Sequence, residues 1–87
     1  MKVTLDKAQF RAVNALRGLP EGAHMMVMTS RPIAAGGILE GAREDFDELV
    51  SHISEELADG MVSAASGRAL ASVAIAIDPD SADWLGM

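Results

Sequence analysis

Residues 46–57 of the chain read FDELVSHISEEL, which is the strongest helical pattern in the sequence. Its apolar side chains recur at intervals of three and four residues, which is the spacing of one face of an α-helix. They are Phe46, Leu49, Val50, Ile53 and Leu57. Acidic residues crowd the first turns, where they complement the positive end of the helix dipole, and Gly60 is suited to end the helix. We therefore expect a helix at 42–59 whose apolar row faces the core.

A first helix is expected at 6–17. Asp6 and Gln9 have the spacing of a capping box, in which each side chain accepts a hydrogen bond from the backbone N–H of the other residue. Gly18 suits the left-handed position that follows a helix, and Pro20 prevents its continuation. The start and the end of this helix are therefore both marked in the sequence.

A pair of strands is expected within 23–40. Residues 23–29, AHMMVMT, form a compact apolar run that favours a strand buried on both faces. Residues 38–40 make a short second strand, and the glycines at 36 and 37 allow a hairpin with a loose loop. The methionines of the first run are expected to fill the core, although unbranched thioethers also suit an adaptable binding surface.

Residues 62–77 fit two structures. Their alanine-rich composition favours a helix with Ser63 as its cap, whereas the alternation VAIAI at 73–77 is typical of a strand. The helix is the preferred prediction. It gives one α+β domain over residues 1–87, a small two-layer arrangement of about three helices packed on a short β-hairpin. The alternative takes 71–77 and Val3–Leu5 as strands and gives a ferredoxin-like βαββαβ order.

The charge of the chain is acidic and unevenly distributed. The formal net charge is −6. Residues 1–39 carry five basic side chains against two acids, a balance of +3, and residues 40–87 carry two against eleven, a balance of −9. Nucleic-acid binding needs a concentrated basic surface, which this distribution does not provide. We therefore expect no nucleic-acid partner.

The chain contains no cysteine. This excludes disulfides, thiolate nucleophiles and cysteine-based zinc sites. Small secreted domains usually depend on disulfides, and the first residues lack the apolar run of a signal peptide, so we expect a cytoplasmic protein. No apolar stretch approaches the length of a membrane-spanning helix, and no membrane association is expected.

Patterns for catalysis or metal binding are weak. No serine lies in a nucleophile elbow, and no calcium loop is complete, so we expect no enzymatic activity and no cofactor. The weak candidates for a metal site are Glu48, His52 and Glu56. They recur every four residues and therefore share one face of the helix at 42–59, where imidazole and carboxylate groups together suit zinc or manganese.

The remaining features favour protein binding. The core is thin, because many apolar residues are alanine and the aromatic ones are two phenylalanines and one tryptophan. Such a core leaves apolar surface for a second copy of the chain or another protein to cover. The acidic half suits a basic partner, since complementary charge speeds and steers association. The candidate contact residues are Met25, Glu44, Asp47, Glu48 and Trp84, the last in a short terminal turn expected after Pro79.

These inferences define two functional hypotheses. The first is a non-enzymatic protein-interaction or regulatory module with an acidic face, whose partner is another protein or a second copy of the chain. The alternative is a small-molecule or metal-binding protein that uses the face of the helix at 42–59. A metal response that depends on His52 would separate the alternative from the first hypothesis.

Overall fold

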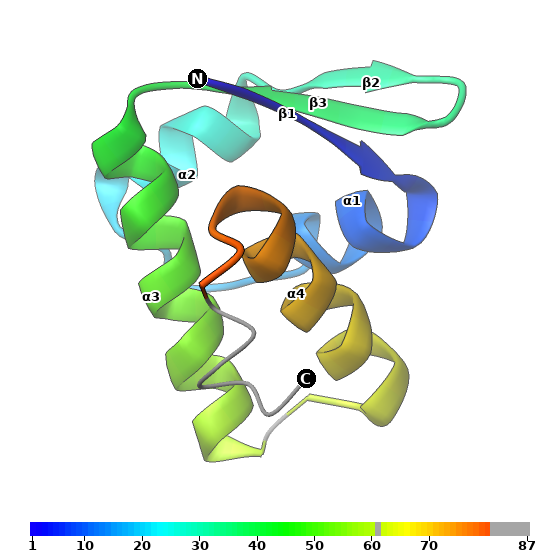
Figure 1. Cartoon of the computed structure of the whole chain (residues 1–87), viewed down its shortest axis with the longest axis vertical. Coiled ribbons are helices and arrows are strands. Elements are labelled where there is room, and N and C mark those ends of the chain that lie inside the picture. The colour runs from blue at the N-terminus through cyan, green and yellow to red at the C-terminus, as the bar shows by residue number, and fades with distance from the viewer. Residues whose placement is uncertain (61, 81–87) are drawn as a thin grey trace.

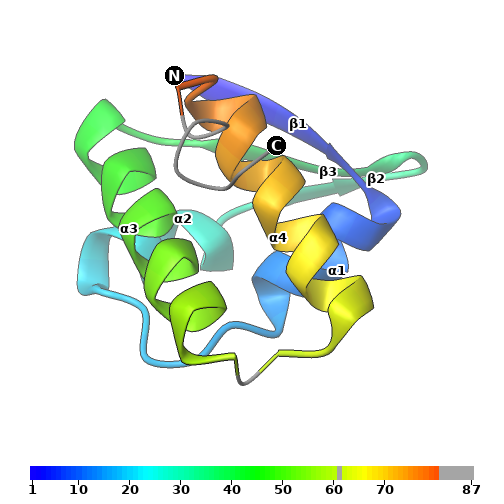
Figure 2. The ribbon, with the colours of Figure 1, turned by 60° about the horizontal axis from the view of Figure 1, so that its bottom comes forward.

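A computed structural model describes residues 1–60 and 62–80 of the chain. The elements are β1 (Lys2–Asp6), α1 (Lys7–Asn14), α2 (Glu21–Met28), β2 (Arg31–Ile33), β3 (Gly36–Glu40), α3 (Arg43–Asp59) and α4 (Ala64–Ile77). The strands form an antiparallel sheet in the order β1-β3-β2, and the helices lie on one side of it (Figures 1 and 2). The α+β class is confirmed, and the described residues hold four helices and three strands, one of each more than expected.

The sheet is built around β3. Along its length β3 pairs with β1, from Lys2 opposite Glu40 to Asp6 opposite Gly36. On its other side β3 pairs with β2, and residues 34–35 join these two strands as a short hairpin. The strand expected at 38–40 therefore lies within β3, but its hairpin partner is β2.

The strand expected at 23–29 is wrong, because most of these residues lie in α2 (Glu21–Met28). Ala23, Met26 and Val27 are buried, at the three- and four-residue spacing of a helix. Met25 and Met28, which we expected in the core, are 55% and 68% exposed. The outward-facing positions of this helix also carry methionine, so the apolar run concealed its helical period.

The helix expected at 6–17 is present but ends earlier, as α1 (Lys7–Asn14). Its capping box is confirmed: Gln9 N donates to Asp6 Oδ1 over 2.8 Å, and Asp6 N donates to Gln9 Oε1 over 2.9 Å. The ring of Phe10 packs against Gly37 of the sheet. A Cβ at position 37 would overlap this ring. α1 therefore packs directly against the backbone of β3.

Residues 64–77 form α4, so the helical prediction for 62–77 is confirmed and the ferredoxin-like alternative is wrong. Ser63 caps the helix as expected, with its Oγ accepting a hydrogen bond from Ser66 N over 3.2 Å. Val73, Ala74 and Ile77 are buried, which is a helical rather than an alternating pattern. Tertiary packing of this apolar face decides between the two structures that the sequence allowed.

The apolar row of α3 faces the core. Phe46, Leu49 and Ile53 are fully buried, and Val50 and Leu57 are partly buried against them. α4 packs beside this row and α2 lies against the first half of α3. The opposite side of α3 is therefore left to solvent, and it carries the acidic residues. Among the described residues, no helix has the length and apolar character needed to cross a bilayer.

Candidate functional site

The solvent side of α3 carries a row of exposed carboxylates. Glu44, Asp47 and Glu55 are exposed, and their spacing of three and eight residues places them on one side of the helix. We call these three residues the α3 acidic face. In the described part of the chain, no lysine or arginine lies within 4.0 Å of a carboxylate oxygen, so no ion pair among these residues offsets this negative charge.

A shallow depression of about 250 Å³ lies along the α3 acidic face. It is lined by Pro20, Asp47, Glu48, Ser51, His52 and Glu55. The carboxylates and the hydroxyl of Ser51 give this depression acceptor groups, and the proline adds a small apolar wall. Such a surface is suited to a guanidinium or ammonium side chain, because both cations offer several donors to carboxylates.

His52 is a largely enclosed ionisable group of the depression, with a side chain that is 11% exposed. Its Nε2 lies 3.4 Å from Oε1 of Glu56, but the two atoms do not form a hydrogen bond, and among residues 1–60 and 62–80 Nε2 has no hydrogen-bond partner. The contact becomes an ion pair only when the imidazole is protonated. In the neutral form, His52 presents little to a ligand from outside.

Glu48 lines the same depression and also contacts α2. Its Oε2 accepts a hydrogen bond from the backbone N–H of Ala23 over 3.3 Å. Gly22 lies beside the carboxylates of Asp45 and Glu48, which a Cβ at this position would approach closely. α2 has no side-chain cap of its own, and these carboxylates of α3 add to the negative charge that Glu21 already places in its first turn.

The proposed metal ligands Glu48, His52 and Glu56 therefore do not converge. Within residues 1–60 and 62–80, no group of three or more histidine, aspartate or glutamate side chains could hold a metal ion. The shared helical face that the sequence indicated is real, but α2 approaches it and takes Glu48 for its own N-terminus. The tertiary contact, which a single helix cannot reveal, decides the role of this carboxylate.

The other candidate contact residues do not form one common surface. Met25 is exposed on α2, three residues from the exposed Met28, so the two thioethers share one side of that helix. Glu44 and Asp47 belong to the α3 acidic face, whereas Glu48 accepts a hydrogen bond from the backbone of α2. Trp84 lies outside the described residues.

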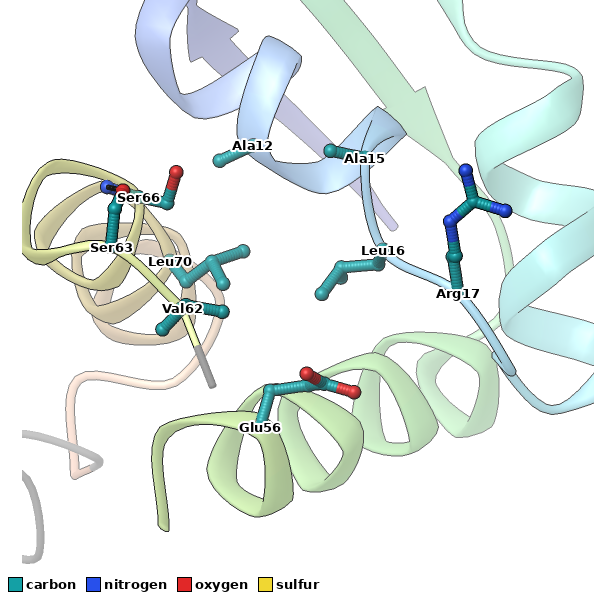
Figure 3. Close-up of a pocket in the computed structure, with 9 residues that line it drawn as sticks. All are labelled: Ala12, Ala15, Leu16, Arg17, Glu56, Val62, Ser63, Ser66 and Leu70. Atoms are coloured by element: carbon teal, nitrogen blue, oxygen red, sulfur yellow. Dashed lines mark hydrogen bonds between the residues drawn. The ribbon is translucent and has the colours of Figure 1, made fainter. Parts of the chain in front are cut away.

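A second hollow, which the sequence did not indicate, lies between α1, α3 and α4 (Figure 3). Its volume is about 340 Å³, and small side chains from α1 and α4 make up much of its wall. Arg17 and Glu56 border it with opposite charges, while Ser63 is engaged as the cap of α4. No base is positioned beside a hydroxyl in its lining, so the hollow offers shape and charge but no reacting pair.

The exposed carboxylates of α3 are the charged feature of this structure on which a function can be proposed. The α3 acidic face stands on a helix whose inner side is anchored by the fully buried Phe46, Leu49 and Ile53. No protein-family model, curated protein or solved structure matches the chain. The geometry of α3 is therefore the basis on which a function is proposed.

Proposed function

We propose that the chain is a non-enzymatic protein-interaction module that binds a basic partner through the α3 acidic face. The observation that carries this proposal is the row of exposed carboxylates at Glu44, Asp47 and Glu55, none of which lies within 4.0 Å of a lysine or arginine of the described chain. Surface charges that are not paired within a protein remain available to steer a partner of opposite sign.

The rigidity of α3 supports the same proposal. Its inner side is anchored by fully buried Phe46, Leu49 and Ile53, so the carboxylates project from a helix that cannot easily shift. A preordered surface loses less conformational entropy on binding than a flexible one. The depression beside Asp47 and Glu55 adds a place for one basic side chain of the partner.

The chemistry of the described residues supports a non-enzymatic role. His24 is exposed on α2, and His52 faces Glu56 without a hydrogen bond. Catalysis by a nucleophile or a general base needs such groups within hydrogen-bond reach of one another. The alternative of a metal-binding protein finds no support in the positions of Glu48 and Glu56. Glu48 accepts a hydrogen bond from Ala23, and no metal-binding group of three side chains occurs in the described residues.

The proposal is tested with two variants that remove equal charge. Asp47→Asn/Glu55→Gln removes two of the three charges of the α3 acidic face, and Glu40→Gln/Asp80→Asn neutralises two exposed acids elsewhere. Proteins that co-purify with the wild type are identified, and the affinity of each for the three forms is measured by calorimetry. We expect a basic partner whose dissociation constant rises at least about tenfold for the first variant and changes less than about threefold for the second.

Salt dependence provides a separate readout. Because exposed charges are screened within about 8 Å at physiological ionic strength, binding through this face should weaken steadily as salt is added. A partner that binds both double variants equally, or whose affinity does not respond to salt, would contradict the proposal.

A further inference from the structure

The sheet has one blocked edge and one open edge. β2 forms one edge with only three residues, and Pro32 in its middle has no backbone N–H to donate to another strand. β1 forms the other edge with five residues and no proline. Unpaired backbone groups on such an edge are a template for a further strand.

The direction of the open groups on β1 follows from its first hydrogen bonds. Met1 N donates to Gly41 O over 3.0 Å, and Gly41 N donates to Met1 O over 3.1 Å. In an antiparallel ladder, pairs that exchange both bonds alternate with pairs that exchange none. Lys2 and Thr4 are therefore the residues whose N–H and C=O groups point away from β3.

These groups are free in the described part of the chain. Lys2 and Thr4 are exposed, and no hydrogen bond from residues 1–60 or 62–80 reaches their outward N–H and C=O groups. The outward N–H of Asp6 is different, because it donates to Gln9 Oε1 within the capping box. The edge is thus open at Lys2 and Thr4 and partly closed at Asp6.

We infer that β1 is a self-association surface, on which two copies of this chain pair their β1 strands antiparallel about a two-fold axis at Thr4. In this register Thr4 donates to and accepts from Thr4 of the second copy. Each Lys2 N–H donates to the Asp6 carbonyl of the other copy, and the two sheets join into one. The inference does not depend on the α3 acidic face.

The charges of β1 select this occupant and this register. With the axis at Thr4, the Lys2 side chain of each copy lies opposite Asp6 of the other on the solvent side of the sheet. Opposite charges placed across neighbouring strands are stabilising, and like charges are destabilising. An axis at Lys2 or at Asp6 would instead oppose two equal charges, and any other axis would pair fewer of the five residues. The strand KVTLD is therefore complementary to itself.

The inner side of the joined sheet is consistent with the same register. Val3 lies opposite Leu5 of the second copy, and both side chains face the helical layer. Leu5 is buried, whereas Val3 is only partly buried in the single chain. Pairing would therefore cover the remaining apolar surface of Val3. Because the strand is short, we expect a weak dimer that forms with rising concentration.

The test compares four forms of the full chain by sedimentation from about 10 μM to about 1 mM, a range that covers weak association. The monomer has a mass of 9.1 kDa. Thr4→Pro removes an outward N–H without removing a bond of the existing sheet, and Lys2→Glu places like charges opposite each other. Lys7→Glu makes the same change of charge just beyond the strand. We expect the dimer dissociation constant to rise at least about tenfold for the first two variants and to change less than about threefold for Lys7→Glu.

Amide hydrogen exchange gives a local readout in the wild type. The Thr4 amide should exchange more slowly as concentration rises, because it donates across the new pair. If Thr4→Pro does not give a native circular dichroism spectrum, the inference is tested by the dissociation constant of Lys2→Glu and by the exchange of the Thr4 amide in the wild type. A wild type that stays monomeric throughout, or a dimer that Lys2→Glu does not weaken and that leaves the Thr4 amide unchanged, would overturn the inference.

Discussion

Ile53 lies in the middle of the buried row of α3, and its replacement by alanine tests how the helices pack. The side chain is fully buried. Ile53→Ala removes three carbon atoms, and at about 0.8 kcal/mol for each buried methylene group the lost transfer free energy is about 2.4 kcal/mol. A residual cavity of about 60 Å³ would add about 1.4 kcal/mol. We therefore expect the free energy of unfolding to fall by about 3–4 kcal/mol.

This loss is large for a chain of this size. At about 0.05–0.15 kcal/mol per residue, a domain of 87 residues has a stability of about 4–13 kcal/mol. The matched control is Ile33→Ala, which makes the same deletion at a position that is 37% exposed on β2. We expect this control to lose less than about 1 kcal/mol, because its side chain keeps much of its contact with water.

Urea unfolding followed by far-ultraviolet circular dichroism measures both values at low micromolar concentration. The slope with denaturant should match the wild type, since a change of slope would indicate an altered unfolded state rather than lost packing. A loss below about 0.5 kcal/mol for Ile53→Ala, or equal losses for the two variants, would refute the inward placement of the row.

The remaining predictions concern two glycines and one carboxylate, and chemical denaturation measures each of them. Gly37→Ala should lower the free energy of unfolding by about 1–3 kcal/mol because the new methyl group overlaps the ring of Phe10, whereas Gly67→Ala should raise it by up to about 1 kcal/mol because α4 has room for a methyl group there. The reverse order would contradict this packing. Glu48→Gln should cost about 0.5–2 kcal/mol because it removes negative charge at the N-terminus of α2, and the exposed Glu55→Gln should change stability by less than about 0.5 kcal/mol. Equal effects of these two substitutions would show that Glu48 has no capping role.

The helices with a clear polar side could be predicted from the sequence. α3 alternates apolar and acidic residues at helical intervals, so its buried row and its exposed carboxylates were both predictable. α1 carries its capping box at Asp6 and Gln9, although the helix ends about one turn earlier than expected. In both helices, local signals and tertiary burial agree, which is the condition under which sequence patterns succeed.

α2 could not be predicted in the same way. Its buried residues have helical spacing, but the exposed Met25 and Met28 are also apolar and hide the period. Pro20 before the helix and Glu21 in its first turn are weak start signals that could have indicated it. As a result, the first strand of the hairpin was predicted at 23–29 rather than at its true position, 31–33. A strand at the position of β1 was predicted only in the ferredoxin-like alternative.

The candidate site was predictable where it depends on one helix and not where it depends on two. The exposure of Glu44 and Asp47 follows from the period of α3 alone. The use of Glu48 as a partner for α2 depends on how two helices meet, which no spacing within α3 reveals. The hollow of Figure 3 likewise arises where three helices meet, and alanine and serine give no local signal of it.

The dependence of α2 on α3 has a consequence for how the chain folds as it leaves the ribosome. Synthesis delivers β1 and α2 first, yet the backbone N–H of Ala23 at the start of α2 donates to Glu48, and β1 takes its hydrogen-bonding partner from β3. Both needs are met by residues made later, so the first third of the nascent chain has no complete layer to fold into. Apolar side chains such as Met26 and Val27, which are buried in the finished fold, remain uncovered until later residues emerge, and exposed apolar surface of this kind promotes aggregation.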